Sequence, residues 1–151
     1  MSSSAPLAKN KVAYFNYAIH DKIEAGIVLK GSEVKSIRLR EITLKDSFAR
    51  VIGNELWLFN CYIKPYPQGS TFNPEPERDR KLLLKRKEID KLIKEIETNG
   101  RVVIPLLVYL SKQNKVKVLL GLGEPKKMHD KRKSIKDRET KREIDRAIKS
   151  N

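Results

Sequence analysis

The most abundant side chains in this sequence that could bind a charged partner are those of lysine and arginine. The segment KKMHDKRKSIKDRE, residues 126–139, holds seven Lys or Arg and one His around only two apolar side chains, Met128 and Ile135. Such a segment has too few apolar groups to build a core, whereas its cations suit phosphate groups. The whole chain has 33 Lys or Arg against 19 Asp or Glu, a formal net charge of +14. This balance favours a polyanionic partner, either nucleic acid or an acidic membrane.

Positive charge is concentrated at the C-terminal end. Residues 125–151 contain 11 Lys or Arg and 5 Asp or Glu, against 22 and 14 in residues 1–124. Ile144, Ala147 and Ile148 share one helical face there, but that stripe is narrow, and each i,i+4 ion pair adds only about 0.2–0.5 kcal/mol. We therefore expect a tail that becomes helical when it binds a polyanion. The alternative is an unstructured basic tail that only raises nonspecific affinity.

A second basic cluster lies in the middle of the chain, where it precedes and enters an amphipathic helix. Its members are Arg78, Arg80, Lys81, Lys85, Arg86 and Lys87. Such a face suits phosphate contacts with RNA, and equally it suits the solvated side of a surface helix. The sequence alone leaves both interpretations open.

Groups suited to catalysis or metal binding are scarce. The chain has two His, His20 and His129, and one Cys, Cys61. No HExxH motif, paired-Cys motif or Gly-rich phosphate loop is present. Cys61 alternates with Trp57 and Phe59, which indicates a core residue, and His20 is expected at a surface turn. We expect no enzymatic activity, no cofactor and no metal; the alternative is a small RNA-modifying enzyme or nuclease whose site only the fold assembles.

The length and the apolar content indicate a single cytoplasmic domain with a tail. With 151 residues the chain has room for one core. No apolar run approaches the roughly 20 residues of a membrane span, and the N-terminus lacks the apolar stretch of a signal peptide. A single Cys excludes an internal disulfide framework and suits a reducing compartment.

The first half of the chain predicts strands around one short helix. Two strands are expected between Val12 and Leu29, joined at the polar residues 20–22. A helix is expected over residues 31–40, with Ser32 as its N-cap. Residues 48–52 and 56–63 should form a hairpin around Gly53-Asn54, because both turn residues tolerate positive φ. Period two puts four side chains of its second strand on one face: Trp57, Phe59, Cys61 and Ile63.

The second half predicts a longer helix and a last pair of strands. After a Pro-rich loop over residues 64–80, residues 81–98 repeat apolar groups at helical spacing and end at Asn99-Gly100. Residues 101–110 and 115–123 read as strands joined by SKQN. A mainly β, OB-fold-like antiparallel barrel with two flanking helices and a basic C-terminal tail leaves no open sheet edge. We divide the chain into a disordered leader (1–9), an OB-like RNA-binding body (10–124) and a conditionally helical tail (125–151).

Four motifs in this order resemble the small protein B family, the SsrA-binding proteins of bacterial trans-translation. They are EAG at residues 24–26, GSEVKSIR at 31–38, RKLLL at 80–84, and KKMHDKR at 126–132 followed by KDRE at 136–139. The resemblance runs from about residue 10 to residue 142. One departure is Glu124-Pro125, which replaces the usual Lys-Gly before the tail and predicts a stiffer hinge.

The resemblance implies a noncatalytic RNA-binding adaptor without a cofactor. Its main partner would be the tRNA-like domain of transfer-messenger RNA (tmRNA, or SsrA RNA), which it would deliver to stalled ribosomes for trans-translation. The tail would enter the mRNA channel near the decoding region of the small subunit. Elongation factor Tu would be an indirect partner through charged tmRNA. The alternative is a general single-strand RNA-binding OB protein without tmRNA specificity.

The resemblance also implies which residues contact RNA and the ribosome. In the body, Asn10, Glu24, Gly26 and Leu83 match family positions tied to RNA binding, and we add the basic side chains of Lys11, Arg80, Lys81 and Lys85. For Glu24 the chemistry is direct, because a carboxylate accepts hydrogen bonds from the Watson–Crick edge of an unpaired guanine. In the tail, the expected ribosome contacts are Lys126, Lys127, His129, Asp130, Lys131, Arg132, Lys136, Arg138 and Glu139.

Overall fold

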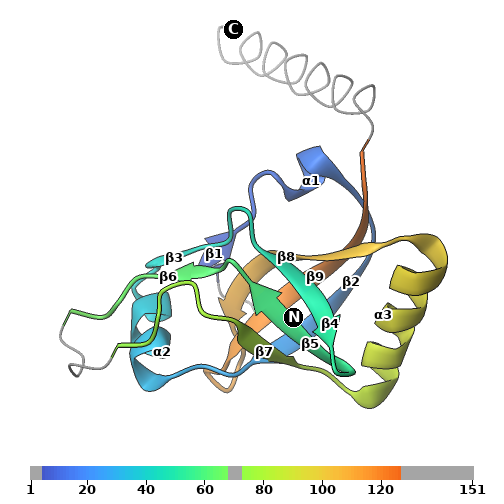
Figure 1. Ribbon diagram of the computed structural model, residues 1–151. Coiled ribbons are helices and arrows are strands. Elements are labelled where there is room, and N and C mark those ends of the chain that lie inside the picture. The colour runs from blue at the N-terminus through green and yellow to red at the C-terminus, as the bar shows by residue number, and fades with distance from the viewer. Residues whose placement is uncertain (1–4, 68–72, 127–151) are drawn as a thin grey trace, which may run out of the picture.

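The computed structural model describes residues 5–67 and 73–126 (Figure 1). The first elements are β1 (Ala8–Lys9), α1 (Ala13–Asn16), β2 (Tyr17–Ile27), α2 (Gly31–Arg38), β3 (Ile42–Thr43), β4 (Phe48–Ile52) and β5 (Glu55–Phe59). They are followed by β6 (Tyr62–Ile63), β7 (Arg80–Leu83), α3 (Arg86–Asn99), β8 (Val102–Leu110) and β9 (Val116–Pro125).

Six of these strands close into an antiparallel barrel. They follow the order β8-β4-β5-β7-β2-β9, and β9 pairs back to β8. Closure removes the open sheet edges that would otherwise pair with another chain. The short β1 adds to β8, and β3 pairs with β6 as a separate two-stranded sheet. The mainly β fold class is confirmed, with α2 and α3 at opposite ends of the barrel (Figure 1).

The core lies inside the barrel because apolar side chains alternate along the strands. Leu58 of β5, Leu82 of β7 and Val118 of β9 are fully buried there. The two larger helices each contribute one buried side chain to the same cluster, Ile37 from α2 and Leu92 from α3. The other faces of the strands point outward, and this outer surface holds the groups available to a partner.

The chain from Tyr17 to Ile27 forms one strand, whereas two strands joined by a turn were expected. The pairing of β2 with β9 shifts register between Ile19 and Asp21, so His20 lies in a bulge inside a continuing strand. A bulge accepts an extra residue without ending the strand, although its polar residues resemble a turn in the sequence. The residues just before β2 form the short helix α1, which the sequence did not predict.

The long helix starts at Arg86, so the expected start at Lys81 was wrong. Residues 80–83 instead pair as β7 with β2 and β5. The predicted end is confirmed, because Gly100 follows the helix with φ of 63°, the left-handed conformation that glycine adopts most easily. In α2 the N-cap position belongs to Lys30, not Ser32, and the Lys30 N–H donates to Glu33 Oε1 at 2.8 Å.

The predicted hairpin turn is confirmed, but the expected shared face is not. Gly53 and Asn54 have φ of 57° and 61° between β4 and β5. Asn60, with φ of 60°, then interrupts the alternation. Consequently two of the four expected residues, Trp57 and Phe59, lie half-buried on the outer side, while Cys61 and Ile63 are buried in the core.

Both boundaries of the body differ from the expected ones. The N-terminal segment is part of the fold from at least Leu7, whose N–H donates to the Val108 carbonyl at 2.7 Å, so residues 7–9 are not a disordered leader. At the other end β9 continues through Pro125. The tail contacts expected from Lys127 to Glu139 lie outside the described residues. Among the helices of the described segments, none has the length and apolar content needed to cross a bilayer.

Candidate nucleic-acid interface

A row of side chains crosses four neighbouring strands on the outside of the barrel. Leu83 of β7 pairs with Gly26 of β2, Gly26 with Lys117 of β9, and Lys117 with Tyr109 of β8. Directly paired residues point to the same face of a sheet. Glu24 lies on this face too, two residues before Gly26. We call Glu24, Gly26, Leu83, Tyr109 and Lys117 the cross-strand surface.

Because Gly26 has no side chain, the backbone is accessible at the centre of the cross-strand surface. A Cβ atom at Gly26 would lie 3.3 Å from the Leu83 Cβ and 3.7 Å from the Lys117 Nζ. The Leu83 side chain is 50% exposed although it is large and apolar. The backbone at Gly26 and the exposed Leu83 side chain together form a shallow apolar area that a partner can contact, and the residues around it are mostly charged.

The Glu24 carboxylate is exposed and is held by a tyrosine. The Tyr109 hydroxyl donates a hydrogen bond to Glu24 Oε2. Burial, together with the neighbouring carboxylate, raises the pKa of Tyr109, so the hydroxyl keeps its proton and remains a donor. A carboxylate has about four acceptor sites. Tyr109 uses one of them, on Oε2. Within the described residues Oε1 accepts no hydrogen bond, so it is available to a donor from a partner.

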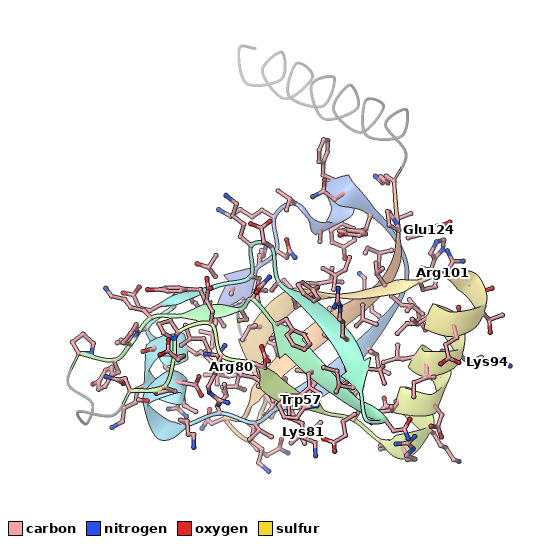
Figure 2. The ribbon with its side chains drawn as sticks, viewed as in Figure 1. Trp57, Arg80, Lys81, Lys94, Arg101 and Glu124 are labelled. Atoms are coloured by element: carbon pink, nitrogen blue, oxygen red, sulfur yellow. The ribbon has the colours of Figure 1, made fainter. Side chains whose placement is uncertain are left out.

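The predicted lysines differ in their exposure and in whether their ammonium groups form ion pairs. Lys81, on the outer side of β7 near Trp57 (Figure 2), forms an ion pair with Glu55 at 2.9 Å. Lys85 is exposed at the N-cap of α3, and its backbone N–H donates to Glu88 Oε1 at 2.9 Å. Lys11 is exposed before α1, next to Asn10, and so does not lie at this surface. Exposed ammonium groups of this kind suit phosphate contacts, which position a nucleic acid without reading its sequence.

Arg80 requires a correction, because a direct RNA contact was expected for it. Its side chain is 0% exposed. Nε donates to Glu33 Oε2 at 2.7 Å, and the two terminal nitrogens donate to the carbonyls of Cys61 at 2.7 Å and Pro76 at 3.0 Å. Because all three nitrogens of this buried guanidinium donate inside the protein, it cannot reach a phosphate. Arg80 instead fastens the Pro-rich loop and α2 to the barrel.

The partner of Arg80 is a buried carboxylate shared by two arginines. Glu33 is 3% exposed and also accepts a hydrogen bond from Arg78 Nη2 on Oε1 at 2.6 Å. Burial alone would raise the pKa of Glu33, but the hydrogen bonds from Arg78, the Lys30 N–H and Arg80 outweigh it and lower the pKa. Glu33 is therefore ionised near neutral pH and compensates both guanidinium groups.

Asn10 lies apart from the cross-strand surface. It is 8% exposed and contacts the edge of β8 opposite to β9, where its Nδ2 donates to the Pro105 carbonyl at 3.0 Å. Its backbone N–H donates to the Leu106 carbonyl at 2.9 Å. Of the predicted body residues, the structure thus brings together Glu24, Gly26 and Leu83, with Lys81 beside them, but not Asn10, Lys11 or Arg80.

Two residues of the cross-strand surface, Tyr109 and Lys117, were missed by sequence reasoning. The available signal was their polarity within otherwise apolar strands, since Tyr109 ends a buried run and Lys117 alternates with Val116 and Val118. Polarity alone marks an outward position. Only the register of β8 and β9 shows that both residues reach Glu24 and Gly26 on β2.

The described residues hold no cluster of His, Cys, Asp and Glu suited to a metal ion. Burial raises the pKa of Cys61 to about 11, so its thiol stays protonated and is a poor nucleophile. His20 lies in the β2 bulge, and its Nε2 is 3.2 Å from Glu124 Oε2. The same Glu124 oxygen accepts a hydrogen bond from Arg101 at 2.5 Å (Figure 2).

Comparison with known proteins identifies the family. The family model described as "SmpB protein" matches residues 7–150, nearly the whole chain. This chain belongs to the SmpB family. Its SmpB relatives include the SsrA-binding protein of Streptococcus agalactiae serotype III (strain NEM316), which is 50% identical over 95% of this chain and 92% of its own length. The SsrA-binding protein of Carboxydothermus hydrogenoformans is 48% identical over 95% of this chain and 96% of its own.

A solved SmpB structure shares the fold. It is described as "tmRNA-SmpB: a journey to the center of the bacterial ribosome" and is 41% identical in sequence. It superposes with a TM-score of 0.68, covering 87% of this chain and 95% of the other. The barrel is thus the SmpB fold.

Within this SmpB chain, the start of the tail is fastened to the barrel. Glu124, near the end of β9, binds both Arg101 and His20, and the Lys126 N–H donates to the Asn16 carbonyl at 2.9 Å. The barrel therefore holds the chain in place as far as Lys126.

Proposed function

We propose that this SmpB protein is a noncatalytic adaptor that binds the tRNA-like domain of tmRNA and delivers it to stalled ribosomes in trans-translation. The observation that carries the proposal is the cross-strand surface, where a fixed carboxylate lies beside bare backbone, an exposed leucine and lysines. The names of the relatives support it, because proteins about 50% identical over the whole body are SsrA-binding proteins. These relatives also favour tmRNA over unstructured single strands as the partner.

Each group on the surface has a defined part in this proposal. The Glu24 carboxylate accepts hydrogen bonds from the Watson–Crick edge of an unpaired guanine, which lysine cannot do. Lys117, with Lys81 and Lys85 nearby, neutralises phosphates and sets the orientation of the RNA. Leu83 and the backbone at Gly26 contact apolar faces of the nucleotides. Specificity thus comes from Glu24, and most of the affinity comes from the lysines.

The tail completes the proposed adaptor. Its basic residues enter the mRNA channel and contact the decoding region of the small subunit, through Lys126, Lys127, His129, Asp130, Lys131, Arg132, Lys136, Arg138 and Glu139. Elongation factor Tu takes part only indirectly, because it is carried by the charged tmRNA. The site of action is the cytoplasm, where ribosomes translate.

A binding titration tests the proposal. The full-length protein is titrated with the isolated tRNA-like domain and with an unstructured RNA of the same length, at two salt concentrations. We expect preference for the folded domain to grow with salt, because nonspecific binding by counterion release fades faster. Equal affinities for the two RNAs at high salt would make this protein a general RNA binder.

The Glu24→Gln variant tests the proposed recognition itself. Loss of a good base contact costs about 1–3 kcal/mol, roughly a 5- to 150-fold change in affinity. Glu41→Gln removes the same charge at an exposed loop position and is the matched control. If both variants bind the tRNA-like domain equally well, Glu24 does not read the RNA.

A further inference from the structure

The only tryptophan of the chain, Trp57, lies on the outside of the barrel and not in its core. Along β5 the inward residues are Leu56 and Leu58, which are fully buried in the core cluster. Trp57 points to the opposite face because side chains alternate along a strand, and it is half-buried there. The part of the indole that remains exposed is apolar area that a partner can contact.

A cation lies in the paired position on each side of Trp57. Trp57 pairs with Lys81 of β7 and with Arg50 of β4. Directly paired residues point to the same face of a sheet, with Cβ atoms about 4.5–5.5 Å apart. Cation, aromatic ring and cation therefore follow one another across three strands, and Figure 2 shows two of the three, Trp57 and Lys81, together on the outer side. We call Arg50, Trp57 and Lys81 the tryptophan row.

The Arg50 guanidinium is oriented by an aromatic ring and lacks a counter-charge. It lies 5.0 Å from the centre of the Phe48 ring. Phe48 in turn stacks on Phe59 with ring centroids 5.5 Å apart. Arg50 is exposed, and within the described segments no carboxylate pairs with it. An exposed arginine of this kind suits a phosphate group.

The tryptophan row continues the cross-strand surface. Leu83 follows Lys81 by two residues on β7, so both side chains lie on the same outer face. In the register of β5 with β7, Leu83 is a diagonal neighbour of Trp57, at a distance of about 7–8 Å. An RNA strand that contacts Gly26 and Leu83 therefore meets the indole next. Together the two surfaces form one outer face that runs from β9 to β4.

We propose that Trp57 stacks on an unpaired base of the bound RNA, beyond the base that Glu24 reads. Arg50 and Lys81 contact the phosphates on either side of that base. The base is unpaired, because bases within an RNA helix stack on one another and only unstacked ones present a face to an aromatic side chain. Every base has such a face, so Trp57 supplies affinity and sets the path of the strand, whereas Glu24 supplies specificity. The inference rests on the proposed function for the identity of the RNA.

Glu55 pairs with one cation of the tryptophan row in the free protein. The Lys81 Nζ atom lies 2.9 Å from Glu55 Oε2, and the two side chains are 41% and 44% exposed. A phosphate that binds Lys81 replaces this carboxylate, and the exposed ion pair that it breaks stabilises the protein only weakly. The proposal therefore implies that Glu55 weakens RNA binding, and that removing its charge strengthens it.

The first test uses Trp57 as its own probe, because its emission is the only tryptophan fluorescence of the chain. The full-length protein is titrated with the tRNA-like domain, with an unstructured RNA of the same length and with an RNA duplex. We expect the first two RNAs to quench the emission by stacking, and the duplex to leave it nearly unchanged. Binding of the tRNA-like domain without quenching, or equal quenching by the duplex, overturns the proposal and leaves the proposed function intact. Quenching by the unstructured RNA without preference for the tRNA-like domain supports stacking on Trp57 and contradicts the proposed function.

The second test separates the aromatic ring from its apolar bulk. Trp57→Leu keeps an apolar side chain without a ring, and Trp57→Phe keeps a ring. We expect Trp57→Leu to weaken binding of the tRNA-like domain by at least about fivefold, and Trp57→Phe by less than about twofold. Melting temperatures show whether both variants fold. Equal affinities of the two folded variants overturn the proposal.

The third test looks for a gain in affinity, which a misfolded variant cannot produce. Glu55→Gln releases Lys81, and Glu41→Gln removes the same charge from a comparable exposed pair with Lys64. We expect Glu55→Gln to strengthen binding of the tRNA-like domain by about two- to fivefold, and Glu41→Gln by less than about twofold. Equal effects would show that only net charge matters and would contradict the proposal. They leave the Glu24→Gln result, and with it the proposed recognition of the RNA, unaffected.

Discussion

The Glu24 carboxylate is oriented by a residue 85 positions away in the sequence, Tyr109. A free glutamate side chain has several rotamers, and restricting them before binding lowers the entropy lost when RNA arrives. Under the proposed function, the tyrosine hydroxyl therefore acts by positioning Glu24. Its effect is expected in specificity more than in total affinity.

We predict that Tyr109→Phe weakens specific RNA binding by about three- to tenfold, in keeping with the net contribution of one ordinary hydrogen bond, because the lost bond positions Glu24 and does not itself reach the RNA. The ring still packs, so the melting temperature changes little. The measurement is affinity for the tRNA-like domain against an unstructured RNA, with Glu24→Gln as reference. Positioning through Glu24 implies that adding Tyr109→Phe to Glu24→Gln causes little further loss. Additive losses would show that the two residues act separately.

The buried Glu33 makes stability depend on pH. Its pKa is lowered from the ordinary 4.5, so its stabilising effect is complete above that value and is lost as pH falls through the lower folded-state pKa. Glu33→Gln leaves Arg80 buried without a full counter-charge, and we predict a loss of about 3–5 kcal/mol in unfolding free energy at pH 7. The difference between wild type and variant should narrow below about pH 4.5.

Urea unfolding at several pH values measures this difference. Glu41→Gln changes an exposed carboxylate and should show a small effect at every pH. A difference between wild type and Glu33→Gln that stays constant from pH 7 to pH 3 would contradict the assigned role of the Glu33 charge.

At the scale of helices and strands, the features predicted correctly are those that depend on short stretches of sequence. The Gly53-Asn54 turn, the end of α3 at Gly100 and the β8–β9 hairpin all follow from residues close together in the sequence. Strand β7 was not predicted, because residues 80–83 fit a helical pattern in the sequence. They form a strand only through pairing with β2 and β5. Tertiary pairing overrode local preference there.

Two glycines at helix ends should respond oppositely to alanine. Gly100 has φ of 63°, where a Cβ atom costs roughly 1–2 kcal/mol, so Gly100→Ala should destabilise the protein by about that amount. Gly31, the first residue of α2, lies in open space without a positive φ, so Gly31→Ala should stabilise by about 0.4–1 kcal/mol. Melting temperatures of the two variants decide this. Effects of equal sign would show that backbone conformation is not the cause.

At the scale of the whole molecule, the proposed function gives the body and the tail separable tasks. A chain that ends at Lys126 keeps the bonds of Glu124 to Arg101 and of Lys126 to Asn16, which a cut after Gly123 would remove. We predict that it melts like the full chain and keeps its preference for the tRNA-like domain, with a shallower salt dependence because fewer cations remain. Peptide tagging on stalled ribosomes should be lost. Tagging that survives the truncation would contradict the proposed task of the tail.

The candidate site was only partly predictable because it is assembled across the whole chain. Glu24, Gly26 and Leu83 became candidates through the resemblance to a family, because their positions in its motifs were enough to select them. Tyr109 and Lys117 join them only through the register of β9 between β2 and β8. Burial made Arg80 a structural residue, which its charge and its neighbours in the sequence did not reveal.

Closure of the barrel also sets a time order for folding during synthesis. β2 needs β9 as its partner, and the His20–Glu124 contact at their ends joins residues 104 positions apart. At roughly 5–20 residues per second, β2 waits about 5–20 s for that partner, while the β4–β5 hairpin and α3 form early. A chain released before residue 116 has no β9 and exposes two strand edges. Incomplete copies of this protein are thus expected to aggregate or be degraded, and not to compete with finished copies for RNA.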